Sequence, residues 1–390
     1  MSVAHQDFAS VGVVGLVGVV GLVGVVGFSD FCKKKDKNLE LSSKCRIFVR
    51  KIANMTDLSI IIPVYQVEKY IRACVSSVFR QGLDESRFEV IIVNDGTKDR
   101  SMEQICDIIG DHRNISVINQ ENQGLSVARN NGMALAKGEY ILLIDSDDML
   151  VDGSLSRILE IALEKKPDLI TADFIRMEEG SNEPLNKIPF PEIIEIQEER
   201  GTNIFIKELN PYECYVWRTL YKRSFMEKNH VCFIPHICYE DIPFTHECYL
   251  KANTYIRVHI PIYIYITRAE SITHTINKER CLDYSTVISK LCKLKTDGRL
   301  PENVLNQLEH NIYLFFHLLF YWFAYCIHDA NDREQICDYL HDNIPDLTMR
   351  QNFSQKINTF CFRYFPHFYV HARYYFGRLV YIKLRRLCRF

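Results

Sequence analysis

The sequence predicts an α/β fold in which helices flank a mostly parallel, Rossmann-like sheet, followed by a helical C-terminal extension. Three observations support this prediction. Apolar runs rich in Val and Ile alternate with segments of helical periodicity between Leu58 and Ile144, as in parallel sheets that helices cover on both faces. Helical patterns alone continue after about Glu279. The composition, with 47% hydrophobic and 25% charged residues in a chain of 390, is that of a folded globular protein.

The predicted elements follow one another in a regular order. The apolar runs LSIIIPVY (58–65) and FEVIIVNDG (88–96) predict buried strands, and EKYIRACVSSVFRQG (68–82) and DRSMEQICDIIG (99–110) predict the helices that follow them. ISVINQ (115–120) predicts a third strand, SVARNNGMALAKG (126–138) a third helix, and YILLI (140–144) a fourth strand. HIPIYIYIT (259–267) predicts a later strand. Strands and helices that alternate in this way form a right-handed parallel sheet.

Each of the first four predicted strands leads into polar or turn-forming residues. In open parallel sheets, ligands bind at the carboxyl ends of the strands, so these residues are expected to share one rim. The fourth strand delivers three carboxylates, Asp145, Asp147 and Asp148, within four positions. Carboxylates this close repel one another, and a bound cation would relieve the repulsion.

Four stretches in order resemble the successive motifs of the family 2 glycosyltransferases, which have the GT-A fold. They are SIIIPVYQVEKYI, VIIVNDGTKDRS, NQGLSVARNNGMALAKGEYILLIDSDD and YEDIPF, and the similarity runs over about residues 58–273. The resemblance implies an inverting enzyme of polysaccharide or cell-envelope glycan biosynthesis. It would move a sugar from a nucleotide-diphosphate donor, a UDP-sugar by default, to a hydroxyl of a saccharide or lipid-linked saccharide.

The resemblance also implies roles for the acids after the fourth strand. Asp147 would bind a divalent metal, Mn²⁺ or Mg²⁺, which prefer oxygen ligands. Asp145 would face the nucleotide ribose or share the metal, and Asp148 would support them. The alternative is that these acids cap a helix that starts near Asp152.

The donor nucleotide would lie between the first two strands. The resemblance implies that Asp95 contacts the nucleobase and that Pro63, Val64 and Tyr65 form the opposite wall, with Tyr65 able to pack on the base. Gly124 would let the backbone approach the ligand closely. Arg129 either lies near the nucleotide or faces solvent, and Asp99 is expected to cap the second helix.

The acceptor side is expected around Glu240 and Asp241. A hydroxyl is a poor nucleophile at neutral pH, so a positioned carboxylate must take its proton as it attacks the anomeric carbon. By resemblance, Asp241 is the base and Glu240 its neighbour in the acceptor pocket. The alternative is that both acids stabilise a helix N-terminus. A further group, expected near the diphosphate by weaker resemblance, comprises Arg268, Ser271 and Thr273.

Two features depart from simple transfer of the family pattern. Thr219 stands where many relatives have Lys before Leu-Tyr, so a role of this stretch in the site is in doubt, and Trp217 either lines the acceptor site or belongs to the core.

Two other functions also stay open. A nucleotidyltransferase would use the acids with Mg²⁺ without Asp241 as base, and a catalytically silent scaffold would not need Asp145, Asp147 and Asp241 intact.

The regions outside the sheet suggest a membrane. Residues 1–54 contain an almost perfect repeat, VGVVGL VGVVGL VGVVGF, which is a low-complexity leader or a membrane anchor, and Met55 is an alternative start. The glycosyltransferase domain is expected at 55–278. The formal net charge of -2 argues against nucleic acid as a partner. We therefore expect a cytoplasmic protein on the inner face of the cell membrane.

The C-terminal region, 279–390, is expected to be helical, basic and aromatic. The apolar run 312–327 is short for a bilayer span and predicts a buried or membrane-dipping helix. No acid occurs from Arg363 to the end. The last predicted helix has an apolar and a basic face, which suits an anionic membrane or packing on its own domain. The residues on these faces are Phe376, Val380, Leu384 and Leu387 against Arg378, Arg385 and Arg389, with Tyr374, Tyr375 and Tyr381 expected at the interface.

Overall fold

The computed structural model describes residues 56–181, 183–186, 194–195, 201–268, 276–297, 300–344, 347 and 353–387. All of these residues fall in one compact unit. The predicted leader, 1–54, and the predicted diphosphate residues Ser271 and Thr273 lie outside the described residues.

The first half of the sheet is parallel, as predicted. The strands β1 (Leu58–Val64), β2 (Phe88–Asp95), β3 (Ile115–Gln120) and β4 (Tyr140–Leu143) lie in the order β3-β2-β1-β4. Ile61 of β1 is in register with Ile91 on one side and Leu143 on the other. β-branched side chains in this pattern suit a strand buried on both faces.

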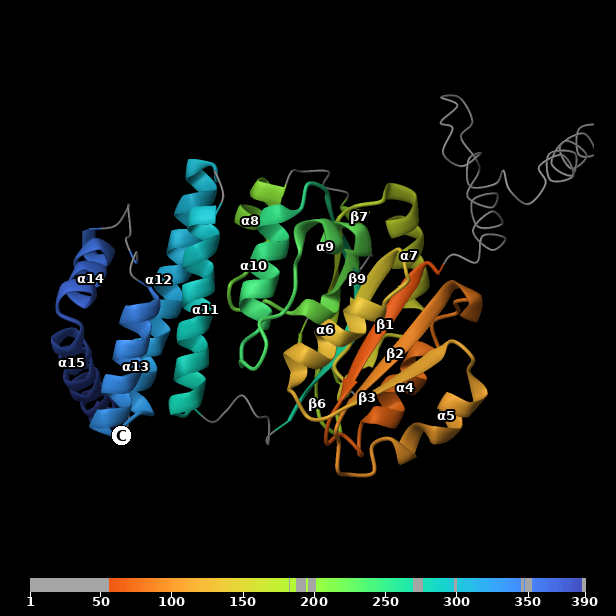
Figure 1. The fold of residues 1–390 in the computed structure, drawn as a ribbon, viewed down its shortest axis with the longest axis horizontal. Helices are drawn as coiled ribbons and strands as arrows, with labels where there is room; N and C mark the ends of the chain where they lie inside the picture. Colours follow the sequence, from red (N-terminus) through yellow and green to blue (C-terminus); the bar gives the residue numbers. More distant parts are fainter. Residues whose placement is uncertain are drawn as a thin grey trace, which may run out of the picture. The chain divides into compact units, whose positions relative to one another are not determined.

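The helices of this half connect the parallel strands. They are α4 (Ile71–Val78), α5 (Cys106–Asp111) and α6 (Leu125–Leu135) (Figure 1). The helix predicted over 99–110 is shorter, because its first part forms a turn and a 3₁₀ segment, Glu103–Ile105. Asp99 accepts a hydrogen bond from the Ser101 backbone N–H (3.1 Å) in that turn, so it stabilises the entry to the 3₁₀ segment.

The second half makes the sheet mixed. β8 (Thr219–Lys222) pairs antiparallel with β4 and with β6 (Leu169–Glu178), and β6 pairs parallel with the long β9 (Tyr255–Thr267). The short strands β5 (Met149–Leu150) and β7 (Ile194–Glu195) pair antiparallel with β9. The predicted α/β class with a GT-A sheet is confirmed. The antiparallel strands bring chain segments after residue 200 next to β4.

The described residues of the second half also form four helices. Two short 3₁₀ segments come directly before β2 and β8. The helices are α7 (Ser154–Lys165), α8 (Gly201–Glu208), α9 (Arg223–Asn229) and α10 (Asp241–Lys251). The 3₁₀ segments are Glu85–Arg87 and Val216–Arg218. The expected core position of Trp217 is confirmed, because its ring is buried and stacks on Tyr263, with centroids 4.1 Å apart.

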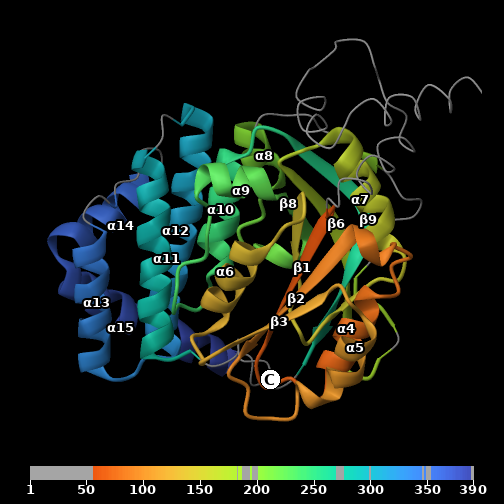
Figure 2. The same cartoon turned by 45° about the vertical axis from the view of Figure 1, so that its right-hand side comes forward.

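The C-terminal region is helical, as predicted. It comprises α11 (Lys278–Asp297), α12 (Glu302–Tyr325), α13 (Ala330–Asn343), α14 (Phe353–Tyr364) and α15 (Pro366–Leu387) (Figures 1 and 2). The apolar run that begins at Ile312 lies in α12 and packs inward, with Phe315, Phe316 and Phe320 buried. None of the described helices has the length and apolar character that a bilayer crossing requires.

Two apolar clusters hold the sheet between its helix layers. Ile60, Ile62 and Leu142 point to one face, where α4 and α7 cover them. Ile61, Ile91 and Leu143 point to the other face, in a cluster that continues through α10 into α11 and α12. Alternation along each strand produces this division. The helical region and the sheet therefore share one core.

Candidate active site

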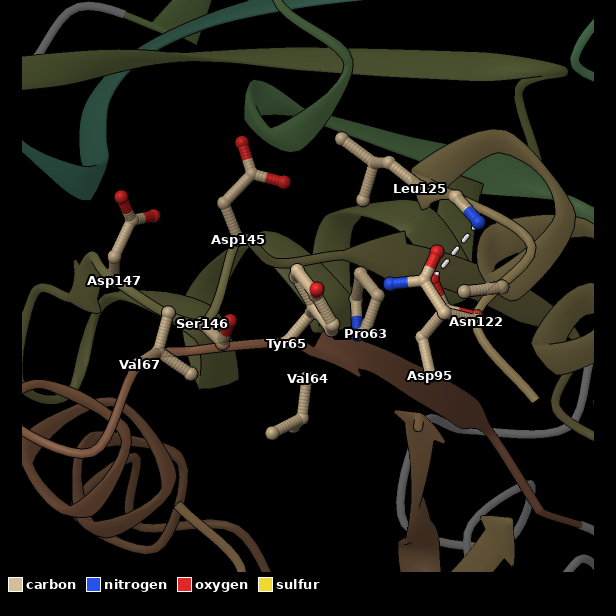
Figure 3. Close-up of a pocket in the computed structure, with 12 residues that line it drawn as sticks. Pro63, Val64, Tyr65, Val67, Asp95, Asn122, Leu125, Asp145, Ser146 and Asp147 are labelled. Carbon is tan, nitrogen blue, oxygen red and sulfur yellow. Dashed lines mark hydrogen bonds between the residues drawn. The ribbon is translucent and has the colours of Figure 1, made fainter. Parts of the chain in front are cut away.

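A cavity of about 410 Å³ lies at the carboxyl ends of β1, β2 and β4. Seven residues predicted from sequence to bind donor or metal line it, and Figure 3 labels all of them except Gly124 around one space. They are Pro63, Val64, Tyr65, Asp95, Gly124, Asp145 and Asp147. The prediction that these strand ends share a rim is therefore met by the geometry.

Asp95 fixes the turn on one side of this cavity. Its carboxylate accepts hydrogen bonds from the backbone N–H groups of Gln123 (2.8 Å) and Gly124 (2.9 Å) and from the Gln120 side-chain amide (2.7 Å). Gly124 has φ +87°, a left-handed conformation that glycine adopts without strain. Asp95 is buried and holds this turn in place. Its contact with a nucleobase stays a prediction.

The three acids after β4 have different surroundings. Asp145 and Asp147 line the cavity and turn their carboxylates to the same side (Figure 3). Asp148 is buried and accepts hydrogen bonds from the Tyr263 hydroxyl (3.0 Å) and the Ile266 backbone N–H (2.8 Å). Burial, with Asp147 nearby, raises the pKa of Asp148 to about 8. Asp148 therefore ties the acidic turn to β9, which suits a supporting role.

Arg268 lies against Asp147. Its guanidinium donates to the Asp147 carboxylate and backbone carbonyl and packs over the Tyr70 ring, 4.1 Å from the centroid. Burial and the nearby Asp145 raise the pKa of Asp147, and Arg268 opposes that rise. The Arg268 guanidinium, which directly follows β9, thus holds the Asp147 carboxylate at the cavity edge.

Arg129 joins the two halves of the site. It leaves α6 into the interior, where its side chain is 1% exposed. Nη2 donates to Asp145 (2.6 Å), and Nη1 donates to Glu240 (2.8 Å) and Asp241 (2.7 Å). Of the two positions expected for Arg129, the one facing solvent is wrong. The guanidinium links a donor-side acid to the acids at the start of α10.

The charges around Arg129 depend on one another. Burial lowers the pKa of Arg129, but Asp241, Asp145 and Glu240 raise it more, so it stays protonated. Burial raises the pKa of Asp241 well above its ordinary value, Arg129 lowers it, and Glu240 and Asp145 raise it again. A carboxyl group in this environment has a stronger tendency to take up a proton than an exposed one.

Neither structural alternative for the acids describes what these side chains contact. Gly153 is the N-cap of α7, with no side-chain cap hydrogen bond. Glu240 occupies the N-cap position of α10 and Asp241 its first turn, where acids stabilise a helix N-terminus, but the Glu240 side chain makes no cap hydrogen bond. Both acid groups instead meet arginines. Thr219, the departure from the family pattern, is buried and shares a hydrogen bond with Thr171 (2.9 Å), so it belongs to the core.

A second cavity, of about 450 Å³, adjoins the first across Gly124 and Leu125, which line both. Glu240 lines it from the start of α10. Sequence reasoning missed the other polar residues that line it. They are His236, Cys238, Tyr239, Arg280 and Asp283. Asp283 accepts a hydrogen bond from the Cys238 backbone N–H (3.0 Å), so α11 of the helical region helps to shape this cavity.

The chain segment that enters α10 is itself unusual. His236 and Tyr239 have φ +59° and +63°, a region that side chains other than Gly, Asn and Asp seldom occupy. Strained backbone of this kind persists only where the surroundings hold it, and it clusters at functional sites. This segment leads into Glu240, which lines the second cavity, and into Asp241, which lines neither cavity but shares the Arg129 guanidinium with Glu240. No sequence signal indicated it, because His and Tyr do not favour this conformation.

Comparison with known proteins agrees with this geometry. The model for "Glycosyl transferase family 2" matches residues 59–229. Over these residues the chain is similar to the family 2 glycosyltransferases. Its similarity to EpsJ of Bacillus subtilis, an uncharacterized glycosyltransferase, is 34% identity over 55% of this chain and 62% of EpsJ. Its similarity to the poly(ribitol-phosphate) beta-glucosyltransferase of Bacillus spizizenii is 30% identity over 50% of this chain and 30% of that protein. The chain thus spans less than two thirds of either relative.

Solved structures agree on the fold. The Staphylococcus aureus TarS fragment 1–349, in complex with UDP, superposes with a TM-score of 0.63 at 19% identity, over 86% of this chain and 93% of that one. At this identity the match concerns the fold alone. It confirms the GT-A class for a family 2 domain followed by helices.

Proposed function

We propose that this protein is an inverting glycosyltransferase that transfers a sugar from a nucleotide-diphosphate donor to a hydroxyl of a saccharide or lipid-linked saccharide. One observation carries the proposal. Two adjoining cavities meet at a charged junction, in which Arg129 holds Asp145 of the first and Glu240 and Asp241 beside the second. A group-transfer reaction between two substrates requires such a junction, where the donor carbon meets the acceptor oxygen.

The first cavity suits the donor. Pro63, Val64 and Tyr65 give it one apolar and aromatic wall, and the Asp95-held turn gives the other. A flat base fits between such walls. We expect UDP as the nucleotide of the donor. The fold shared with TarS, whose crystal structure contains UDP, supports this expectation. GDP- and dTDP-sugars are the alternative donors.

The donor set fits a divalent metal. Asp145 Oδ1 pairs with Arg129 and Asp147 Oδ2 with Arg268, which leaves one oxygen of each carboxylate without a hydrogen-bond donor among the described residues. Two such oxygens suit Mn²⁺ or Mg²⁺, which take few protein carboxylates beside phosphate and water. When bound, the metal neutralises the charge that develops on the departing diphosphate. Asp147 would be its main ligand and Asp145 would share it.

Asp241 is proposed as the base. Its carboxylate accepts from Arg129 through Oδ1, which leaves Oδ2 to take the proton of an acceptor hydroxyl. Burial raises the pKa of Asp241 and so favours proton uptake by this group, and the Arg129 guanidinium opposes that rise. Glu240 shares the guanidinium and holds it in place. Attack from the second cavity, on the side away from the donor nucleotide, inverts the anomeric centre.

The second cavity is proposed for the acceptor. Its lining combines Tyr239, Arg280 and Asp283 with apolar groups, a mixture that suits the hydroxyls and carbon face of a sugar. A lipid-linked acceptor would be reached only at a bilayer surface, so peripheral attachment to the inner face of the cell membrane stays a prediction of this proposal.

A screen of sugar nucleotides tests the proposal. Purified protein is incubated with UDP-, GDP- and dTDP-sugars, with Mn²⁺ or Mg²⁺ and with saccharide and lipid-linked acceptors, and nucleotide diphosphate release is measured. We expect release from one donor class, dependent on metal and acceptor and lost in Asp147→Asn. Release of pyrophosphate from a nucleoside triphosphate would indicate a nucleotidyltransferase instead. Release from no donor with any acceptor would indicate a silent scaffold.

A further inference from the structure

A stripe of large apolar side chains runs along α14. Phe353, Ile357, Phe360 and Tyr364 are three or four residues apart, so they lie on one face of the helix. All four are exposed, Phe353 to 77% and Phe360 to 56%, whereas Phe362 on the opposite face is buried. A helix normally turns such a stripe to the core. The stripe on α14 faces outward instead, and a different face of the same helix, with Thr359 and Phe362, is the buried one.

The stripe continues into α15. Phe365 connects the two helices and Phe368 lies in the first turn of α15, and both are exposed, Phe368 to 75%. We call these six exposed residues the aromatic surface. They are Phe353, Ile357, Phe360, Tyr364, Phe365 and Phe368. The rings of Phe360 and Tyr364 are in contact, with centroids 4.6 Å apart. Contiguous apolar patches of this kind on a protein surface mark interaction sites.

Basic side chains flank the aromatic surface. Lys356 and Arg363 are exposed and lie on the same edge of the α14 stripe, because they are seven residues apart. The Arg363 guanidinium is 5.7 Å from the Tyr364 ring centroid. No Asp or Glu occurs from Phe353 to the end of the chain. The surface is therefore apolar in its centre and positive at its edge.

We propose that the aromatic surface docks on an anionic lipid bilayer. Aromatic side chains prefer the boundary between acyl chains and headgroups, and Lys and Arg beside them attract anionic headgroups. A second copy of the chain is a poorer occupant. A two-fold contact of this surface with itself would set Lys356 and Arg363 against their own copies, and like charges this close repel one another. The nearby acids belong to α13, where Asp338 pairs with His367 (3.2 Å) and Asp342 with His341 (3.6 Å).

This placement differs from the membrane face expected from sequence. Tyr374 was expected at the interface, and that prediction is wrong, because its ring is buried under the Arg333 guanidinium, 3.7 Å from the centroid. Tyr375 and Phe376 are exposed. The side chains of Val380, Leu384 and Leu387, and those of Arg378, Tyr381, Arg385 and Arg389, lie outside the described residues. The described part of the chain places the docking surface on α14 and the first turn of α15.

The inference rests on the proposed function for its purpose, since docking would bring the second cavity to an acceptor carried by a lipid. Docking itself does not require catalysis, so the two can be tested apart. The test must also distinguish docking by the aromatic surface from lipid binding through the apolar repeat 11–28, which belongs to the full chain. A probe placed on the aromatic surface itself meets both needs.

Tryptophan quenching provides that probe. Phe360→Trp in the full chain is mixed with vesicles of phosphatidylcholine and phosphatidylglycerol whose acyl chains are brominated, and the quenching beyond that of the wild type is recorded. The matched control is Leu135→Trp, at an exposed position on α6. We expect quenching of Phe360→Trp on anionic vesicles, weaker quenching on phosphatidylcholine alone or at high salt, and none for Leu135→Trp.

A charge variant tests the basic edge. Lys356→Gln with Arg363→Gln, in the Phe360→Trp background, should raise the lipid concentration for half-maximal quenching on the order of tenfold. Absence of quenching in Phe360→Trp, equal quenching of Leu135→Trp, or equal quenching on phosphatidylcholine alone would overturn the proposal. So would emission of Phe360→Trp that shifts with protein concentration without vesicles, because that indicates a second copy.

The same samples separate this inference from the proposed function. Nucleotide release with a soluble saccharide acceptor should be equal in Phe360→Trp and in the wild type. Quenching without nucleotide release from any donor would uphold docking and reject the proposed reaction. Release without quenching would uphold the reaction and reject docking.

Discussion

Arg129 is the residue on which the charges of the site depend. Its guanidinium contacts three carboxylates and packs 5.1 Å from the centroid of the Phe233 ring. The three carboxylates are buried or partly buried, and without the guanidinium they would lack a compensating positive charge, which carboxylates removed from water need. The same contacts hold Asp241 beside Glu240, which lines the second cavity.

Replacement of Arg129 by Met should therefore destabilise the protein strongly. Removal of the only guanidinium that the described residues place among these acids leaves them uncompensated, and we expect the free energy of unfolding at pH 7 to fall by about 3–5 kcal/mol. Arg129→Lys keeps the charge and should lose less. Denaturant unfolding measures both. Equal stability of Arg129→Met and wild type would show that the ion pairs contribute little.

The residues of the donor cavity were largely predictable, and those of the acceptor side were only partly so. Asp95, Asp145 and Asp147 follow apolar strands in short motifs, so their place at the rim follows from local sequence. The Arg129 contact with Asp241 spans 112 positions, and no local pattern specifies it. Arg280 and Asp283 join the site from a region whose periodicity indicated only helix.

At the scale of elements, the parallel half of the sheet shows how closely its helices pack. Gly138 ends the segment after α6 beside β1. A Cβ there would lie 2.4 Å from the backbone N of Ser59 and 2.5 Å from the backbone C of Leu58, so only glycine fits. The alternation of strand and helix predicted β1 to β4, because each strand there contains a short run rich in Val, Ile or Leu.

Gly138→Ala should force β1 away from the turn and lower the free energy of unfolding by about 1–3 kcal/mol. The matched control is Gly110→Ala in α5, where a Cβ meets no atom within 4 Å. That change should stabilise the protein by about 0.5–1 kcal/mol, because alanine favours helix. Thermal unfolding of both variants measures the difference. A Gly138→Ala variant as stable as Gly110→Ala would contradict this packing.

The other half of the sheet was harder to predict. β6 begins as an apolar run and then alternates, and β8 has four residues. Both pair with strands distant in sequence, so their direction depends on contacts that periodicity does not report. β9 was predicted only over 259–267 and begins earlier, at Tyr255, where it pairs with the apolar start of β6.

At the scale of the whole molecule, the helical region supports the helix that carries the proposed base. On α10, His246 donates through Nδ1 to the Ile242 carbonyl (2.7 Å), and its Nε2 accepts from the Asn311 side chain of α12 (3.2 Å). Glu247 pairs with Lys290 of α11 (3.0 Å). These contacts hold α10, which begins at the proposed base Asp241, against α11 and α12.

His246 should also make stability depend on pH. Burial lowers its pKa from 6.5 to about 4, so between these values the unfolded chain binds more protons than the folded one. Stability therefore falls as pH falls through this window. From pH 6.5 to 4, the wild type should lose on the order of 3 kcal/mol more than His246→Gln. Denaturant unfolding across this range measures it, and parallel curves for both proteins would contradict it.

The central claim is that Asp241 acts as the base between the two cavities. Asp241→Asn keeps a carbonyl oxygen for Arg129 but cannot take a proton. Sugar transfer and UDP binding are measured on the same preparation, by product formation and by calorimetry. The account predicts transfer lower by about 10²–10⁴-fold, with UDP affinity near that of the wild type. Transfer at the wild-type rate would contradict it.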